Sequence, residues 1–449
     1  MIYAVVLIII IIILLFLVAL FMLPSLYWYW KGVDTVSPIT YLANIFKKEP
    51  LCLILQHFYN TLKGRGKKFG GYYFLGRPIF VPTDLDLIKK MLNNDFDHFS
   101  DHIGYVDAEK NPLSLHVFNT RGCHWKKIRS KLTPSFTSVK CRTMFDTALK
   151  CAQDFNQLVI KCTDRNEPID IRDVSERFTT DAIVSYVFGV ESKALRNATS
   201  EFRRLTTELL KSFRMMLLVF CPEPFGLFKI GHFGQDITNF YTNLVKQTDK
   251  YRKENGIVRE DYIHHLLKNR SDDTITDCDV NETKVKSYTG LSLSEIAAQC
   301  FIIYMAGFET SAAAISYTLA ELALNQEIQN KVREEIKAVL GNHNRKITYE
   351  AIQEMEYLNK CLYETLRKYP LVPTNTRLCT KSYKIPNSDV VINEGTYVFL
   401  PTYALHRDPE YFPDPEKYDP DRFSMRSAKI RQHSAFLPFG DGPRKCIGK

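Results

Sequence analysis

The first hydrophobic pattern in the chain is an unbroken apolar run over residues 2–23, which contains no charged side chain. As a helix rising about 1.5 Å per residue, it would extend about 33 Å, enough to cross a hydrocarbon core of about 30 Å. A cleaved signal peptide is the alternative, but its apolar core is usually shorter, about 7–15 residues. Trp28, Tyr29 and Trp30 follow the run as an aromatic belt, and Lys31 comes next. This order favours a retained transmembrane anchor.

Beyond this run, apolar positions mostly follow the spacing of amphipathic helices. Ser292 and Glu295 form a capping box that opens the longest helix, whose middle is almost entirely apolar or small. The predicted helices cover residues 84–93, 125–163, 175–188, 292–325, 326–340 and 355–369, and the predicted strands lie within 72–81, 383–385, 390–392 and 396–400. Residues 268–290 are polar and aperiodic, which predicts a surface loop. The predicted fold class is therefore mainly α with small β-sheets (α+β).

The domain organisation follows from the absence of a second linker. After residue 40 no change in composition divides the chain into independent cores. The expected segments are a transmembrane anchor over residues 1–23, a linker over residues 24–40 and one large domain over residues 41–449.

Charge and cysteine content indicate where the large domain lies. Lys31, Lys47 and Lys48 follow the anchor and no basic side chain precedes it, so the positive-inside rule places the domain in the cytosol. The eleven cysteines, an odd number without framework spacing, agree with a reducing compartment. The sequons, which would stay unmodified there, begin at Asn197, Asn269 and Asn281. The net charge of +9 is spread out, without the aromatic-interleaved basic stripe of a nucleic-acid binder.

The most informative motif lies near the C-terminus. Its pattern, F-x-x-G-x-R-x-C-x-G, is formed by Phe439, Gly442, Arg444, Cys446 and Gly448. A lone cysteine in a glycine-containing loop beside an arginine suits a thiolate that binds haem iron axially. The alternatives for Cys446 are a small buried apolar residue, a zinc ligand, or a nucleophile with His433 as a weak candidate base. With the whole pattern present, we predict that Cys446 is the haem ligand.

The chain resembles the cytochrome P-450 superfamily through five motifs that occur in the family's order. Besides the cysteine pattern, these are Trp125 with Arg129 (W-x-x-x-R), Ala306 to Thr310 (A-G-x-E-T), Glu364 with Arg367 (E-x-x-R), and Pro420 to Phe423, where the family usually has P-E-R-F. Residues 305–311 and 419–424 are most similar to the insect xenobiotic-metabolising branch. The resemblance implies the family's triangular prism fold and haem b, iron protoporphyrin IX, as cofactor.

The central helix carries the residues that the resemblance implies for catalysis. Ala306 and Gly307 are small, so another group can approach the helix backbone closely at this point. We expect the neighbouring Glu309 and Thr310 to be buried. A threonine in a helix can simply bond back to its own backbone, which is the structural alternative. The resemblance implies instead that Thr310 stabilises bound dioxygen and that Glu309 helps to deliver protons, and both roles favour cleavage of the O–O bond of O2.

Further residues are implied in haem binding because buried propionates require cationic or N–H donors. The resemblance assigns this role to Trp125, Arg129, Arg377 and Arg444, and less directly to His102, which stands where many relatives carry arginine. Ala306 and Phe439 are implied to lie against the haem. Glu364 and Arg367 are implied to be scaffold residues that pair with Arg422.

The function that the resemblance implies is insertion of one oxygen atom of O2 into lipophilic small molecules. Electrons would come from NADPH through NADPH-cytochrome P-450 reductase, with cytochrome b5 as an optional second donor, at the cytosolic face of the endoplasmic reticulum. The substrate class implied is xenobiotic, such as insecticides and plant allelochemicals. The alternatives are oxidation of an endogenous hormone or pheromone, and a non-catalytic membrane-tethered haem or lipid binder.

Three further expectations concern the reductase, the substrate and the end of the chain. Basic residues that would receive an acidic reductase are Lys126, Lys127 and Lys131. Residues that would line an apolar substrate pocket are Phe118, Phe213, Met216, Phe220, Phe301, Met305, Ala306 and 371–374, although core packing is the simpler interpretation for any one of them. Because relatives continue beyond this motif, we expect residues 1–449 to be a fragment that alone holds haem poorly.

Overall fold

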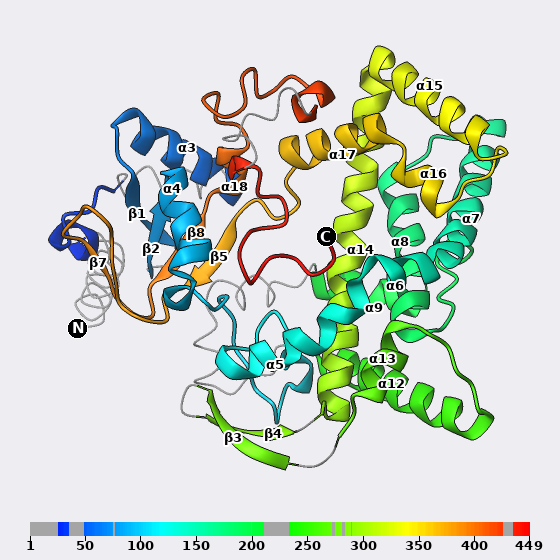
Figure 1. The fold of residues 1–449 in the computed structure, drawn as a ribbon, viewed down its shortest axis with the longest axis horizontal. Helices are drawn as coiled ribbons and strands as arrows, with labels where there is room; N and C mark the ends of the chain where they lie inside the picture. The colour runs from blue at the N-terminus through cyan, green and yellow to red at the C-terminus, as the bar shows by residue number, and fades with distance from the viewer. Residues whose placement is uncertain are drawn as a thin grey trace, which may run out of the picture. The chain divides into compact units, whose positions relative to one another are not determined.

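The computed structural model describes residues 26–35, 49–74, 77–198, 200–210, 233–271, 274–280, 283–288, 290–424 and 434–449. The chain forms two compact units (Figure 1). Unit 1 comprises Met1–Ile103, Val372–Lys417 and Ala428–Cys446, and unit 2 comprises Gly104–Leu371, Tyr418–Ser427 and Ile447–Lys449. The predicted anchor over residues 1–23 lies outside the described residues and stays a prediction, as does the single large domain.

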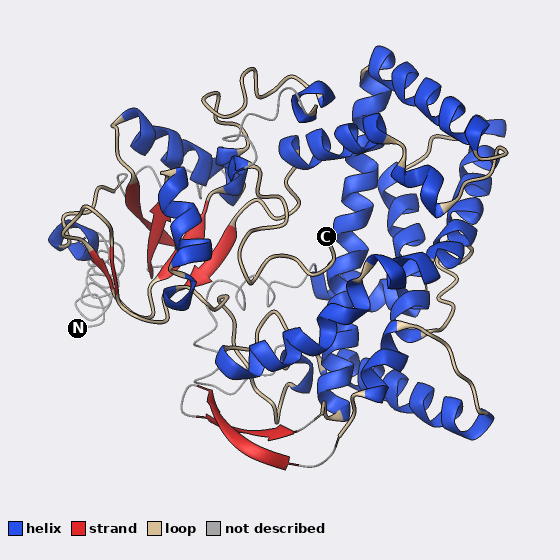
Figure 2. Cartoon of the chain, in the orientation of Figure 1, coloured by secondary structure: helices blue, strands red, loops and turns tan. Residues whose placement is uncertain are grey.

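Unit 1 is built on a four-stranded sheet in the order β1-β2-β8-β5 (Figure 2). Its strands are β1 (Phe69–Phe74), β2 (Arg77–Pro82), β5 (Asn375–Leu378) and β8 (Tyr397–Leu400), and a separate hairpin joins β6 (Tyr383–Lys384) to β7 (Val391–Ile392). The β1–β2 pair is the predicted hairpin, with Phe69 opposite Pro82. Strand β8 pairs in parallel with β2 and antiparallel with β5, so it is an interior strand, and all its residues are buried.

Short helices cover the sheet of unit 1. They are α3 (Leu51–Gly64), α4 (Leu85–Lys89), a π-helical turn (Lys90–Asn94), a 3-10 turn (Phe96–His98) and α18 (Thr402–Leu405). One buried apolar cluster runs through this unit and includes Trp28, Phe80, Ile88, Phe99 and Val398, none of them measurably exposed. Since α4 and its π-helical continuation supply Ile88, Met91 and Leu92 to the cluster, their backbone is fixed firmly against the core.

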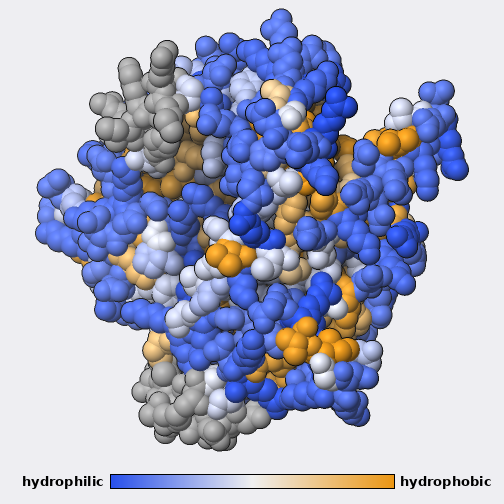
Figure 3. All heavy atoms as spheres, turned by 45° about the vertical axis from the view of Figure 1, so that its right-hand side comes forward, coloured by the Kyte–Doolittle hydropathy of each residue, from blue (hydrophilic) through white to orange (hydrophobic). Residues whose placement is uncertain are grey.

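Unit 2 is almost entirely helical. Its helices are α5 (Gly122–Leu132), α6 (Ser138–Thr143), α7 (Phe145–Asp164), α8 (Ile171–Phe188), α9 (Glu201–Leu210), α12 (Gln235–Asn255), α13 (Tyr262–Lys268), α14 (Leu293–Leu324), α15 (Gln326–Asn342), α16 (Tyr349–Gln353) and α17 (Glu356–Lys368). Three 3-10 turns cover Pro112–Ser114, Thr133–Phe136 and Pro420–Phe423. The face shown in Figure 3 is mostly hydrophilic, as expected when amphipathic helices turn their apolar sides inward.

Helix α14 is the longest element and the centre of unit 2 (Figure 1). The predicted capping box is confirmed, because the Ser292 side chain accepts from Glu295 N and the Glu295 side chain accepts from Ser292 N. The helix packs most extensively against α8. Among the described residues it is the one helix long and apolar enough to cross a membrane, but 56% of its most apolar window is buried within the protein. That burial is the behaviour of a core helix.

The fold class, mostly helical with small sheets, is confirmed, but two of the predicted elements are wrong. The helix expected over residues 125–163 is divided into α5, the 3-10 turn Thr133–Phe136, α6 and α7. Pro134 explains the break, because proline has no N–H to donate and its ring clashes with the preceding turn.

The stretch over residues 268–290, expected to be a loop, contains an antiparallel hairpin. Its strands are β3 (Thr274–Val280) and β4 (Thr283–Tyr288), paired from Thr274 opposite Tyr288 to Val280 opposite Thr283. Threonine and valine recur in both strands, and β-branched residues favour extended backbone. The expectation failed because it looked for hydrophobic alternation, which a polar hairpin does not need.

Candidate functional site

The loop that carries Cys446 is shaped by two glycines in the left-handed region. Gly440 has φ +67° and Gly442 has φ +72°. A Cβ atom on Gly442 would lie 1.9 Å from the Leu92 carbonyl oxygen, so only glycine fits against this turn. Cys446 N donates to Phe439 O at 2.9 Å, which closes the loop. The Cys446 side chain is an exposed free thiol at the end of this rigid turn.

Arg444 anchors the same loop to the body of unit 1. Its side chain is buried, and Nε donates to Ser100 O at 2.7 Å while Nη2 lies 3.1 Å from Asp101 Oδ1. Asn93 adds a second attachment, since its Nδ2 donates to Asp441 Oδ2 at 3.0 Å. The cysteine loop is therefore positioned by contacts to residues more than 340 positions earlier in the sequence.

A second buried cation lies on β5 of unit 1. Arg377 is only 2% exposed; its Nη1 donates to Thr376 O at 2.8 Å, and its Nε has no hydrogen-bond partner among the described residues. Burial lowers the pKa of Arg377 to about 10. His102 Nδ1 lies 3.4 Å from Arg377 Nη1 and 3.1 Å from Thr376 O. Burial, followed by the charges of Arg377 and Arg444, lowers the pKa of His102 well below its ordinary value. This is an environment suited to an anionic ligand.

The residues expected for catalysis lie on α14 in unit 2. Thr310 Oγ1 donates to Ala306 O at 2.5 Å, which is the back-bonding alternative. Glu309 and Thr310 are half-buried rather than fully buried, and Ala306 is exposed. Glu309 instead accepts a hydrogen bond from Arg172 Nη2 on α8 at 3.1 Å. Arg172 is a residue that sequence reasoning missed, because it lies 137 positions away and no motif links the two.

Helix α5 carries the expected Trp125 and Arg129, one helical turn apart, with Trp125 buried and Arg129 half-buried. The preceding residue, His124, fixes this helix to α14, since its Nε2 lies 2.7 Å from Glu295 Oε1. Both side chains are at most 6% exposed. Lys126 is exposed and Lys127 and Lys131 are half-buried; their docking role stays a prediction.

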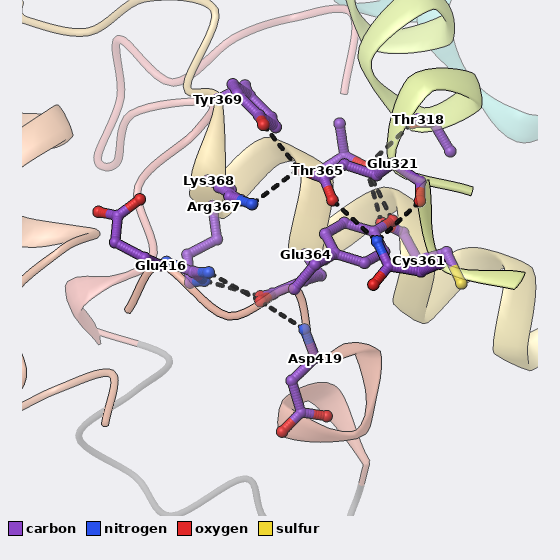
Figure 4. A network of polar contacts seen from close by, with 12 residues as sticks. Thr318, Glu321, Cys361, Glu364, Thr365, Arg367, Lys368, Tyr369, Glu416 and Asp419 are labelled. Carbon is purple, nitrogen blue, oxygen red and sulfur yellow. Dashed lines mark hydrogen bonds and ion pairs between the residues drawn. The ribbon is translucent and has the colours of Figure 1, made fainter. Parts of the chain in front are cut away.

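The Glu364–Arg367 motif lies on α17 within a buried polar network (Figure 4). Glu364 accepts two hydrogen bonds from Arg367, both at 2.7 Å, and neither side chain has exposed area. Arg422 Nε lies 3.4 Å from Glu364 Oε1, and Asp419 N donates to the same oxygen at 2.9 Å. The pairing expected between these residues and Arg422 is confirmed, and it is structural.

The sequence profile of the family Cytochrome P-450 matches residues 35–449. The chain belongs to the cytochrome P-450 family. A protein of Drosophila melanogaster named probable cytochrome P-450 6a14 is 38% identical over 435 residues, covering 94% of this chain and 85% of the relative. Cytochrome P-450 6a2 of the same organism is 36% identical, and probable cytochrome P-450 6d2 is 34% identical, each again covering 94% and 85%. The resemblance inferred from motifs is confirmed.

Membership of the cytochrome P-450 family makes the chain a haem-thiolate monooxygenase. The donor set of unit 1 fits haem on two observations. Cys446 offers an exposed thiol on a preformed loop, and Arg377 offers a buried N–H without a partner among the described residues, where a propionate would supply one. Arg377 and Arg444 both lie close enough to His102 to influence its charge, and Phe439 contributes its carbonyl to the cysteine loop.

The residues expected to line the substrate pocket differ in their burial in the cytochrome P-450 structure. Phe213, Met216 and Phe220 lie outside the described residues. Phe301 is 1% exposed and packs edge-on against Phe233 and Tyr241, which supports the core-packing alternative for this residue. Exposed or half-buried positions are Phe118, Met305, Ala306 and residues 371–374. Their contact with substrate stays a prediction.

The His124–Glu295 pair predicts a pH dependence of stability. Burial raises the pKa of Glu295, but hydrogen bonds from His124 and Ser292 outweigh it, so the pKa lies below its ordinary 4.5. A carboxyl group whose pKa is lower in the folded state than in the unfolded state stabilises the folded protein at pH values above its unfolded-state pKa. This stabilisation is lost as the pH falls through the folded-state pKa. We expect Glu295→Gln, which keeps the capping oxygen, to lower the urea midpoint at pH 7. The difference from wild type should shrink below pH of about 4.5; a difference that does not change with pH would contradict a stabilising Glu295 carboxylate.

Proposed function

We propose that the chain is a membrane-anchored monooxygenase that oxidises lipophilic small molecules. The proposed substrates are xenobiotics such as insecticides and plant allelochemicals. NADPH-cytochrome P-450 reductase would deliver the electrons, with cytochrome b5 as an optional second donor, at the cytosolic face of the endoplasmic reticulum. The apolar run over residues 2–23 supports the anchor. The Drosophila relatives of the 6a and 6d groups support the assignment to the insect branch.

One observation carries the proposal: Cys446 is an exposed thiol at the end of a loop locked by Gly442 and by buried Arg444. Neutral structural cysteines tend to be buried, and three in this chain, Cys300, Cys361 and Cys379, are buried. In those three, burial raises the pKa of the thiol. Cys446 differs from them in exposure and in the rigidity of its backbone, as an axial ligand requires.

Different side chains would bind the haem and deliver protons. Cys446 would hold the iron, and Arg377, Arg444, His102, Trp125 and Arg129 are the proposed donors to the propionates. When bound, haem supplies activation of O2, so that one oxygen atom enters the substrate and the other leaves as water. Glu309, which is 40% exposed and accepts from Arg172, is the residue proposed to help deliver protons, and Thr310, whose hydroxyl donates to Ala306 O, is the residue proposed to stabilise O2.

The test is a carbon-monoxide difference spectrum of the reduced protein. The wild type should show the Soret band of a thiolate-ligated haem, and Cys446→Ser should lose it. Cys141→Ser is the matched control, because Cys141 is exposed on α6 and should leave the band intact. A Cys446→Ser protein with an unchanged band would overturn the assignment. Turnover of an insecticide compared with a steroid or terpenoid hormone then distinguishes the substrate classes.

A further inference from the structure

The start of the cysteine loop is held by a buried histidine from another part of unit 1. The loop runs from Leu437 to Cys446, and the Leu437 backbone N–H donates to His406 Nε2 at 2.9 Å. His406 has no exposed area, and Leu437 is only 5% exposed. Figure 1 shows the red segment that leads into the loop beside α18, the helix whose C-terminal cap is His406. One side chain therefore satisfies a buried backbone donor where the loop begins.

His406 is itself carried on a fixed backbone. Its N–H donates to Thr402 O at 3.0 Å within α18. The Thr402 hydroxyl accepts from Asn375 Nδ2 on β5 at 2.9 Å, which ties this helix to the sheet. Ala404 and Leu405 belong to the buried apolar cluster of unit 1. Because the backbone of α18 is held from both sides, the position of the imidazole is well defined.

Two aromatic rings fix the orientation of the imidazole. Phe436 stacks on it, with the ring centres 5.5 Å apart and the planes at 29°, and Phe412 approaches edge-on at 6.1 Å and 70°. Since the Leu437 N–H is the donor, Nε2 has to be the ring nitrogen without a proton. The histidine thus supplies both an aromatic ring for packing and a lone pair for the hydrogen bond, and substitutions can separate the two.

The His406 contact lies at a different part of the loop from the contacts described above. Asp441 and Arg444 attach the middle and the end of the loop to the rest of unit 1, whereas Leu437 is its first residue. If the acceptor at Nε2 is removed, the buried Leu437 N–H is best satisfied by water. Water can reach this N–H when the start of the loop opens, so open forms of the loop should become more populated.

We propose that His406 is a positioning residue for the haem ligand, because it keeps the cysteine loop in the conformation that presents Cys446. The proposal rests on the proposed function, in which Cys446 binds the iron. A ligand that requires one conformation binds more weakly in proportion to the fraction of protein in that conformation. Contacts that orient a metal ligand from behind usually change affinity by about 10–100-fold.

The test uses the full chain and two variants that separate the lone pair from the ring. His406→Phe keeps an aromatic ring beside Phe412 and Phe436 but has no acceptor. His406→Gln loses the ring but can place its amide oxygen near the position of Nε2. We expect haem transfer to excess apomyoglobin to be about tenfold faster from His406→Phe than from wild type, with His406→Gln between the two.

A second measurement does not depend on haem chemistry. Hydrogen–deuterium exchange of the backbone amides of residues 437–446 should be faster in His406→Phe than in wild type, while exchange in α14 should be unchanged. His57→Phe is the matched control, because His57 is exposed on α3 in the same unit and makes no contact with the loop in the described residues. It should match wild type in haem transfer and in exchange.

Wild-type haem transfer and exchange in His406→Phe would overturn the proposal. A larger effect of His406→Gln than of His406→Phe would also overturn it, since the ring and not the lone pair would then matter. Faster exchange in α14 as well as in the loop would show a general loss of stability instead of a local restraint. Absence of the thiolate band in the wild type would count against Cys446 as the ligand, whereas exchange in the loop still decides whether His406 restrains it.

Discussion

Arg367→Met is expected to lower the free energy of unfolding by about 3–5 kcal/mol, the usual cost of removing one partner from a buried ion pair. Glu364 and Arg367 have no exposed area and share two hydrogen bonds of 2.7 Å. Methionine fills much of the volume but leaves a buried carboxylate with Asp419 N at 2.9 Å and Arg422 at 3.4 Å. Urea unfolding followed by circular dichroism measures the change in midpoint.

Two comparisons make this expectation specific. Arg204→Met removes an ion pair with Glu208 on α9, but those side chains are 54% and 57% exposed, so we expect less than about 0.5 kcal/mol. Adding Glu364→Leu to Arg367→Met should recover only part of the loss, because it removes the stranded carboxylate but also takes the acceptor from Arg422 and Asp419 N. A cost for Arg367→Met no larger than that of Arg204→Met would contradict the buried pair.

Gly442→Ala is expected to remove most of the thiolate-ligated haem signal. At φ +72° a residue with a Cβ atom pays roughly 1–2 kcal/mol of strain, and the new atom would also lie 1.9 Å from Leu92 O. Because Leu92 belongs to the core of unit 1, the loop has to move instead of the carbonyl. Cys446, four residues later, moves with it. Haem affinity should fall at least about tenfold, measured by haem titration and the carbon-monoxide spectrum.

Gly440→Ala is the matched control, since Gly440 has a similar φ of +67° but its Cβ would meet nothing closer than 3.6 Å. It carries the backbone strain without the collision, so its haem affinity should lie between those of wild type and Gly442→Ala. Equal losses in the two variants would show that strain alone acts and that the approach of Leu92 is unimportant.

Local signals in the sequence predicted the elements that depend on neighbours a few residues apart. The capping box of Ser292 and Glu295, and the pairing of Glu364 with Arg367 at i, i+3, are set by helix geometry and are confirmed. Strand β5 was missed because its four residues, Asn375–Leu378, include the charged Arg377 and show no hydrophobic alternation. A short strand at the sheet edge is stabilised by its partner β8 rather than by its own pattern.

The parts of the candidate site that sequence could not supply depend on contacts across the chain. Nothing in the motif around Glu309 indicates Arg172, and nothing near His124 indicates that its partner is Glu295, since these pairs form only when helices pack. Glu295 takes part in the local capping box with Ser292 and also in the long-range contact with His124. The cysteine motif predicted the ligand, whereas its support by Ser100, Asp101 and Leu92 required the fold.

The buried guanidinium of Arg377 has a consequence for the life of the protein in the cell. If a haem propionate binds Arg377 as proposed, the protein without haem leaves the buried Arg377 Nε without its acceptor, which costs stability. A ligand that binds only the folded form adds stability in proportion to the logarithm of its concentration. Haem supply should therefore slow the proteolysis of newly made copies, because fewer of them would be unfolded.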